Sequence, residues 1–472
     1  MPFNPFNWSR PITLRRRVAV VGLLRSGKTV LLTSLISHFQ HHKPAVLPIG
    51  GNGQTAKVSV IGERPTASGF PPFPFREHRN DLSGQRWPAK THDVSEYRAE
   101  FARSDWRKTK LDLSLLDMPG ERLADLLIAA SKDFATWSDH VLQMFQQCPE
   151  FFEQSREYFD LQKALEGREP TSVDAEQVVA AYRLVLARLI CTFMPVVTPS
   201  TFLIPPNGEP IPAQILQADQ QSRIEELART RHSGLSASEQ FAPLPISLRQ
   251  RFPDITRAFG NFYHRYRSEF VWKFAKALKH ADDLVVLVDV AGLLEGGDGM
   301  FNANVELLKT LLTFISPGCT LRGKLFRIAS LGHWRWDRVR RVTFVATKSD
   351  RVLPDDVDRL EDLLREMVES TVDGLRANGP RFEVDYVSCA AVRSAKPHDN
   401  PATKLEFDAH DDQSNSIKPH IGEVPRIPES WPANWSPGEY RFPKPLPRMP
   451  TTRTAVPQHY GLEQIAELIL GE

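Results

Sequence analysis

The chain has 472 residues, of which 41% are hydrophobic and 25% charged, and its formal net charge is +2. A chain of this length predicts two domains with elaborations rather than one small core. The near balance of charge gives no general reason to expect nucleic acid or an acidic substrate as the main partner.

The cysteines and the apolar runs indicate the compartment. The four cysteines are widely spaced and form no CxxC pair, which favours free thiols over disulfides or zinc; they are Cys148, Cys191, Cys319 and Cys389. The longest apolar runs are far shorter than a membrane span, and the N-terminus lacks an apolar core followed by a cleavage site. We therefore expect a soluble, cytoplasmic protein.

The first motif is GLLRSGKT, residues 22–29, which lies between an apolar strand pattern, RRRVAVVG, and a helical pattern, KTVLLTSLISHF. It matches the phosphate-binding P-loop in its required strand-to-helix context. Glycines let backbone N–H groups wrap the phosphates, Lys28 reaches the outer phosphates and Thr29 offers a hydroxyl to Mg²⁺. The alternative is a glycine turn before an ordinary helix. The expected nucleotide contacts here are Gly22, Leu24, Arg25, Ser26, Gly27, Lys28, Thr29 and Val30.

Arg25 occupies a position where most Ras-like loops carry a small residue. The GxxRxGK[ST] pattern is similar to the loop of guanylate-binding proteins and atlastins, where this arginine implies an arginine finger acting in cis. A guanidinium near the β–γ bridge neutralises charge that grows as the bond breaks. The alternative is that Arg25 faces solvent or pairs with a carboxylate of the insertion described below.

Residues 43–90 include ERPTASGFPPFPFRE, for which we expect an extended, packed loop, with peptide binding as the alternative. Thr91 in WPAKTHDVSEY stands where Ras-like GTPases place a switch threonine that joins Mg²⁺; the alternative is an ordinary loop threonine.

VSEYRAEFAR then alternates apolar and polar residues, and SDW can turn the chain, so an antiparallel hairpin with the next strand is predicted.

That next strand, in TKLDLSLLDMPGER, ends at Asp117, which can hold Mg²⁺ through water, while Gly120 of the DxxG turn can offer an N–H to a γ-phosphate. Glu121 stands where Ras-like proteins place a water-orienting glutamine. An ionised glutamate cannot donate a hydrogen bond, although it can accept one from water or pair with Arg122. We therefore expect slow intrinsic hydrolysis.

From Leu123 to about His280 the pattern is mostly helical, and DDLVVLVDV then restores a buried strand. A Ras-like domain has a single short helix at this place. An insertion that leaves directly from the DxxG segment can read the nucleotide state.

The strand RRVTFVATKSD ends in a TKxD element, in which the Asp350 carboxylate can accept hydrogen bonds from guanine N1–H and the 2-amino group. Adenine lacks both donors, so a buried Asp350 facing it would stay unpaired. Lys348 is expected along the base plane. RFEVDYVSCAAV then ends in a segment, Cys389 and Ala390 included, that resembles the fifth GTPase signature, whose alanine N–H contacts guanine O6. A solvated turn is the alternative for TKSD.

Two further segments carry weaker signals. Residues 321–341 combine many Arg and Lys with two tryptophans, a pattern suited to anionic lipid or RNA, or to a solvated helix face. The proline-rich stretch from 393 to 457 predicts extended wrapping, and YGLEQIAELIL predicts a terminal amphipathic helix.

Together, VAVVGLLRSGKTVLLTSL, LLDMPGER, VATKSD, the helical insertion and the proline-rich tail resemble the YcjX-like family of bacterial P-loop proteins over nearly the whole chain. The resemblance implies a role in bacterial stress responses, including the phage-shock regulon, and a cytoplasmic position near the inner membrane. It also implies a membrane-associated protein partner or an anionic membrane surface. The family has been described as ATPase-like, which conflicts with the role expected for Asp350, and we side with the residue.

The predicted fold class is α/β: a P-loop, Ras-like GTPase core with a mostly parallel sheet plus one antiparallel strand, and an inserted all-α domain. The expected boundaries are 1–122 and 281–472 for the two parts of the core and 123–280 for the insertion. The expected function is a GTP-binding and GTP-hydrolysing switch that requires Mg²⁺ and alternates between GTP and GDP. The expected catalytic residues are Arg25, Lys28, Thr91 and Glu121, and the expected metal site is Thr29, Thr91 and Asp117.

Three other functions stay open. An ATPase would use the same loop with Asp350 facing elsewhere, and a P-loop kinase would pass phosphate to a small acceptor. A non-enzymatic scaffold would hold nucleotide structurally and act through the basic tryptophan segment. A homodimer across the nucleotide, frequent in TKxD-type GTPases, is a further alternative, and no specific nucleic acid partner is expected.

Overall fold

The structure is a computed structural model of the chain. It describes residues 12–23, 26–50, 55–67, 69–88, 93–106, 109–169, 172–193, 198–203, 219–229, 239–315, 339–378, 382–398, 403–410 and 416–471. The basic tryptophan segment and the N-terminal residues lie almost entirely outside these ranges.

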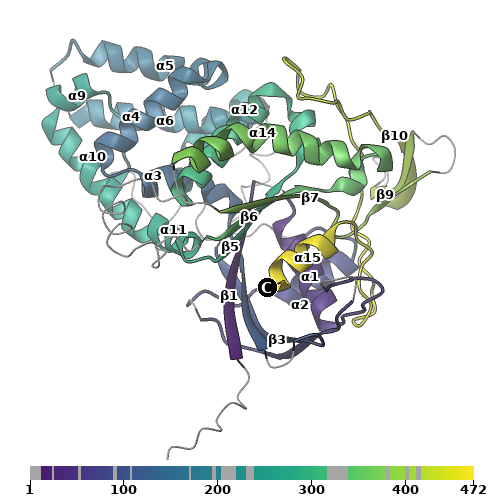
Figure 1. Ribbon diagram of the computed structural model, residues 1–472. Coiled ribbons are helices and arrows are strands. Elements are labelled where there is room, and N and C mark those ends of the chain that lie inside the picture. Colours follow the sequence, from purple (N-terminus) through teal and green to yellow (C-terminus); the bar gives the residue numbers. More distant parts are fainter. Residues whose placement is uncertain are drawn as a thin grey trace, which may run out of the picture.

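A seven-stranded mixed sheet forms the centre of the molecule (Figure 1). Its spatial order is β2-β3-β4-β1-β5-β6-β7, and four neighbouring pairs, from β4 to β7, are parallel. β3 runs antiparallel to both neighbours, so the predicted hairpin with the Asp117 strand is confirmed. The strands are β1 (Ile12–Gly22), β2 (Val58–Glu63), β3 (Ser95–Arg103), β4 (Thr109–Asp117), β5 (Asp283–Val288), β6 (Arg341–Thr347) and β7 (Glu383–Cys389).

Helices cover both faces of this sheet because its central strands are apolar on both sides. In β1, Ala19 and Val21 join one core while Val18 and Val20 join the other. The first core packs against α12 (Val290–Ile315) and α14 (Val357–Asn378); the second packs against α1 (Lys28–Gln40) and α15 (Leu462–Leu470) (Figure 1). The terminal amphipathic helix is thereby confirmed as a core helix.

The chain between β4 and β5 is helical, as its periodicity predicts, and most of these helices lie to one side of the sheet (Figure 1). Their apolar faces meet in a core rich in aromatic rings, in which Trp137, Tyr182 and Tyr263 are fully buried. The helices are α3 (Leu126–Ala130), α4 (Phe134–Gln147), α5 (Pro149–Leu165), α6 (Ser172–Phe193), α8 (Gln220–Arg229), α9 (Ile246–Arg251), α10 (Pro253–Tyr266) and α11 (Trp272–Lys279).

Residues 43–90 include the edge strand β2 and α2 (Phe75–Ser83); between them the described residues of 64–74 have no helix or regular strand and bury Phe70 and Phe73, in keeping with the expected packed loop. One expectation of irregular structure is wrong. The segment after β7 contains a second, antiparallel sheet of three strands, β8 (Ala395–Pro397), β9 (Lys404–His410) and β10 (Ile417–Glu423). In this sheet cross-strand backbone pairing outweighs the local proline content, because Pro397 and Pro419 occupy a strand end and an edge strand.

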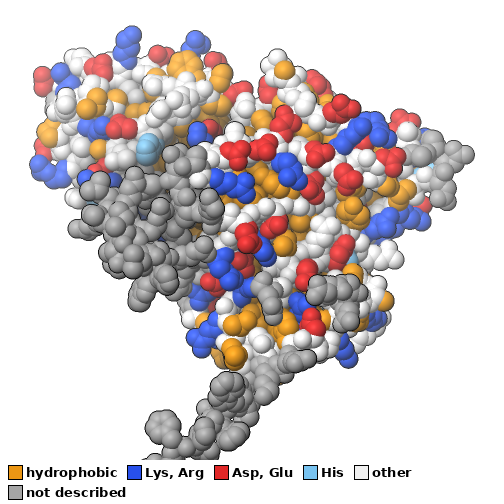
Figure 2. Space-filling view, in the orientation of Figure 1, with side chains coloured by type: hydrophobic (Ala, Val, Ile, Leu, Met, Phe, Trp, Pro, Cys, Tyr) orange, Lys and Arg blue, Asp and Glu red, His pale blue; other side chains and the backbone are white. Residues whose placement is uncertain are grey.

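The remainder of the tail, from Val424 to Tyr460, has no helix or regular strand and wraps over the core as expected. Acidic and basic side chains are interspersed on the face shown in Figure 2, in keeping with the small net charge. No helix within the described ranges is both long enough and apolar enough to cross a membrane.

Candidate functional site

A cavity of about 770 Å³ opens where the central strands end. Most of its lining comes from five stretches, each of which follows the carboxyl end of a parallel strand or begins the next helix, the usual place for ligands in α/β folds. Two further pairs complete the lining: Trp87 with Pro88, and Lys444 with Pro445. The residues predicted from sequence that line it are Ser26, Gly27, Lys28, Thr29, Val30, Gly120, Glu121, Lys348, Asp350, Cys389 and Ala390. The cavity therefore brings the expected phosphate end and the expected base end into one space.

The phosphate end is built by the turn from β1 into α1. Gly27 has a φ of 85°, in the left-handed region that glycine adopts without strain, and α1 begins at the next residue. The first backbone N–H groups of α1 have no partner within the helix, and the positive end of the helix dipole lies here. The Ser26 hydroxyl is fully buried beside the cavity with no hydrogen-bond partner among the described residues. The chain thus presents unsatisfied donors at the place where phosphates are expected.

Lys28 is 8% exposed, and its ammonium donates to the carbonyl oxygens of Gly22 at 3.1 Å and Leu23 at 3.3 Å. Burial lowers the pKa of Lys28, and the carboxylates of Asp117 and Glu121 partly offset that effect. A cation held by neutral carbonyls in a desolvated position gains much from a phosphate.

The Thr29 hydroxyl lies 3.2 Å from Asp117 Oδ2, so the P-loop and the end of β4 meet directly. Hydroxyl and carboxylate oxygens are the ligands that Mg²⁺ prefers, so the Thr29 hydroxyl and the Asp117 carboxylate fit the expected metal site. Within the described ranges no group of three or more His, Cys, Asp or Glu side chains could hold a metal ion. A metal here would therefore need phosphate and water oxygens to complete its ligands.

Gly120 approaches the P-loop so closely that no side chain fits. A Cβ on Gly120 would lie 2.3 Å from the Gly22 carbonyl oxygen and 2.8 Å from Lys28 Nζ. The DxxG turn is thus packed against the phosphate end of the cavity, which also receives Glu121.

We expect Gly120→Ala to weaken nucleotide binding about tenfold or more, because relieving the overlap must displace the P-loop or Lys28. Titration of a fluorescent nucleotide measures the effect. Gly62→Ala on β2 is the matched control, because a Cβ there meets nothing within 4 Å. Equal affinities for the Gly120→Ala and Gly62→Ala proteins would contradict the close packing described here.

At the base end, Asp350 Oδ2 accepts hydrogen bonds from the backbone N–H groups of Ser394 at 2.6 Å and Ala395 at 3.2 Å. Burial raises the pKa of Asp350, and these two hydrogen bonds oppose that rise. They fix the carboxylate by one oxygen at the wall of the cavity.

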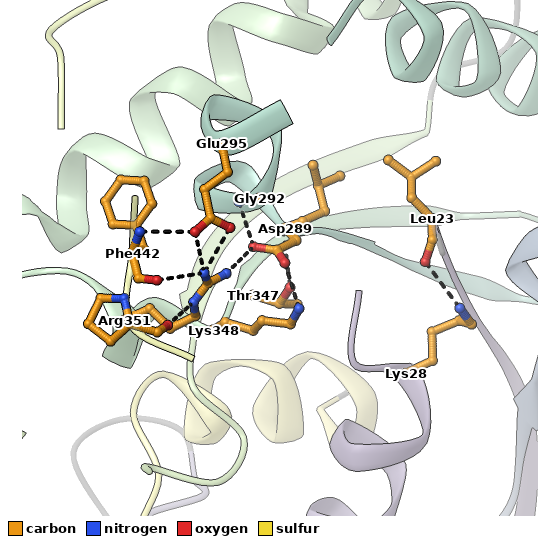
Figure 3. A network of polar contacts seen from close by, with 11 residues as sticks. Leu23, Lys28, Asp289, Gly292, Glu295, Thr347, Lys348, Arg351 and Phe442 are labelled. Carbon is orange, nitrogen blue, oxygen red and sulfur yellow. Dashed lines mark hydrogen bonds and ion pairs between the residues drawn. The ribbon is translucent and has the colours of Figure 1, made fainter. Parts of the chain in front are cut away.

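Lys348 has a φ of 59°, and its ammonium is bound to Asp289 Oδ2 at 2.5 Å (Figure 3). Asp289 was not predicted from the sequence, although it directly follows β5 and lines the cavity. Its position at the end of a buried strand is the pattern that could have indicated a site residue. Burial acts to raise the pKa of Asp289, but Lys348 and Arg351 outweigh it and hold the pKa below the usual value. Arg351 in turn pairs with both oxygens of Glu295 at 2.9 Å.

The backbone N–H of Ala390, expected to contact guanine O6, donates instead to the Tyr460 carbonyl at 2.9 Å. The Tyr460 N–H donates back to the Ala390 carbonyl at 2.9 Å, so the tail is paired with this loop. This arrangement differs from the expected one because a distant segment takes up the donor. Leu24, Arg25 and Thr91 lie outside the described residues.

Comparisons with known proteins agree with these motifs. The pattern of the YcjX-like family, DUF463, matches residues 16–472. A protein of Escherichia coli (strain K12) named "Ras-like GTPase YcjX" is 24% identical over 484 aligned residues, which cover 98% of this chain and 97% of that protein. The similarity thus extends over the core, the helical segments and the tail.

Proposed function

The chain belongs to the YcjX-like family, and from that premise we propose that it binds and hydrolyses GTP as a molecular switch. The observation that supports this most is the single cavity that carries a P-loop at one end and the TKSD aspartate at the other. The name of the Escherichia coli relative points the same way. The role in stress responses rests on the family resemblance.

At the phosphate end, Lys28 would exchange its carbonyl partners for phosphate oxygens, and the N–H groups at the start of α1 would bind the same oxygens. Thr29 and Asp117 would hold Mg²⁺, which supplies positive charge to the β- and γ-phosphates. Gly120, packed on the P-loop, is placed to sense whether a γ-phosphate is present.

At the base end, Asp350 would accept hydrogen bonds from guanine N1–H and the 2-amino group. Two backbone donors already bind its Oδ2, which stabilises the ionised form that this role needs. Adenine offers no donor at either place, so guanine is favoured. If ATP binds as well as GTP, the ATPase alternative holds.

The nucleotide state would reach the helical segment through Asp125, the last residue of the short helix that starts at Gly120. Asp125 is 2% exposed, and its carboxylate accepts from the Ser200 N–H at 2.9 Å, the Ser200 hydroxyl at 2.6 Å and the Tyr266 hydroxyl at 3.0 Å. A movement of the DxxG turn therefore acts on residues 123–280, which we propose as an inserted domain that reads the switch.

Phosphate release from GTP and ATP by the wild-type protein, with Mg²⁺ and with EDTA, tests the proposed reaction. We expect Mg²⁺-dependent, slow release from GTP in excess over ATP. Arg25→Ala is expected to lower turnover about a hundredfold or more while GTP affinity changes little, because a finger neutralises charge that develops only in the transition state. If Arg25→Ala lowered turnover and GTP affinity by the same factor, Arg25 would not act as an arginine finger.

A further inference from the structure

The C-terminal tail forms one wall of the cavity beside the base end. Lys444 and Pro445 line the cavity together with Asp289, Asp350 and Arg351. These residues are separated from the TKSD element by about ninety positions in the chain, so no local pattern predicts their presence here.

The backbone on both sides of Lys444 is fixed. The Phe442 N–H donates to Glu295 Oε1 at 2.9 Å, and Arg351 Nε donates to the Pro443 carbonyl at 2.6 Å (Figure 3). On the other side, the Leu446 N–H donates to the Asp408 carbonyl at 2.8 Å. Arg351 is itself only 7% exposed and bound to Glu295. Lys444 therefore projects from a rigid support, as a binding residue should.

Three cationic side chains line this end of the cavity, those of Lys348, Arg351 and Lys444, and the first two already form ion pairs with carboxylates. Lys348 is bound to Asp289, and Arg351 is bound to Glu295 and two tail carbonyls. Lys444 is exposed and makes no hydrogen bond or ion pair within the part of the chain that the structure describes. It is the cation at this end that is available to a ligand.

Guanine needs a donor that the loop after β7 does not provide through Ala390. The Ala390 N–H is held by Tyr460 in a two-bond bridge, and Gly461, which follows Tyr460, packs closely on the same loop: a Cβ on Gly461 would lie 2.0 Å from the Ser388 carbonyl oxygen. Guanine carries two acceptors, O6 and N7, on its major-groove edge, with O6 beside N1–H, and lysine is a common partner of these acceptors. Adenine places an amino group where guanine has O6, so an ammonium there gains no hydrogen bond from adenine at that position.

We propose that Lys444 is a base-contacting residue that donates to O6 of guanine, and that the tail thereby completes the selection of the base. This rests on the proposed function, since it assumes that a guanine nucleotide occupies the cavity. Asp350 would read N1–H and the 2-amino group, and Lys444 would read O6.

Binding of GTP, ITP and ATP to Lys444→Met, in the full-length protein, tests this assignment. GTP and ITP both carry O6, and ATP does not. We expect Lys444→Met to weaken binding of GTP and of ITP about tenfold each, as for one charge-assisted hydrogen bond, and to leave ATP binding unchanged. Arg441→Met is the matched control, because Arg441 lies on the same tail, donates among the described residues only to the Gly438 carbonyl, and does not line the cavity.

Equal losses for GTP, ITP and ATP would place Lys444 on the ribose or the phosphates and overturn the assignment. So would unchanged binding of all three. The wild-type protein reports separately on the proposed function: if it binds GTP and ATP equally, the guanine assignment fails and the role of Lys444 fails with it. Thermal melting of both variants checks that the tail stays docked.

Discussion

Lys28→Ala is expected to lower the affinity for GTP at least about a hundredfold. Lys28 is almost fully buried, and its ammonium donates to the backbone carbonyls of Gly22 and Leu23 at the phosphate end of the cavity. A phosphate in reach of this ammonium forms a charge-assisted contact without further desolvation of the lysine, since burial has already removed its water. About 3 kcal/mol of binding free energy, which corresponds to this loss, is within the range for such a contact.

Isothermal titration with GTP measures the change. Lys57→Ala is the matched control, because it removes the same charge from an exposed position outside the cavity. An affinity for GTP in Lys28→Ala within threefold of the Lys57→Ala value would show that this loop does not bind the phosphates. Melting of the nucleotide-free proteins separates a binding defect from unfolding.

Asp125→Ala is expected to lower the free energy of unfolding by about 3 kcal/mol. The substitution leaves the Ser200 N–H and two hydroxyl groups buried without their common acceptor. Because these groups join the DxxG segment to the helical region, we also expect the response of α10 amides to GTP, seen by hydrogen exchange, to disappear.

Urea unfolding of the nucleotide-free protein measures the first effect. Asp125→Asn keeps the shape and one acceptor and should lose about 1 kcal/mol, while Asp254→Ala, at a 91% exposed side chain, should lose less than about 0.5 kcal/mol. A loss in Asp125→Ala no greater than in Asp254→Ala would contradict the importance of this buried carboxylate. If the α10 amides of Asp125→Ala still responded to GTP as in the wild type, the hydrogen bonds of Asp125 would not transmit the nucleotide state.

Much of the central sheet could be predicted because its signals are local. The alternation in VSEYRAEFAR marks a strand with one apolar face, and β3 indeed pairs antiparallel with β4. The P-loop likewise needs only a strand, a glycine turn and a helix in sequence, and Gly27 takes the left-handed conformation that such a turn requires.

The base end was less predictable because distant segments build it. Tyr460 pairs with Ala390 across seventy residues and takes up the N–H that the local motif assigned to guanine. Asp289 binds Lys348, although nothing near either residue in the chain predicts the other. Edge strand β2 and the sheet of β8 to β10 were not predicted for a similar reason: their stability comes from cross-strand pairing with other segments. In β8 and β10, Pro397 and Pro419 also weaken the local strand signal.

Guanine selection by Asp350 is the central claim, and competitive binding of GTP, ATP and XTP to the wild type and to Asp350→Asn tests it most directly. In the variant, the N–H groups of Ser394 and Ala395 should hold the amide oxygen, which turns the amide NH₂ toward the base. That NH₂ group repels the donors of guanine and can donate to the 2-oxo group of xanthine. We predict that the wild type prefers GTP and that Asp350→Asn prefers XTP. A preference for ATP that the substitution leaves unchanged would contradict the account and make TKSD a turn of an ATPase.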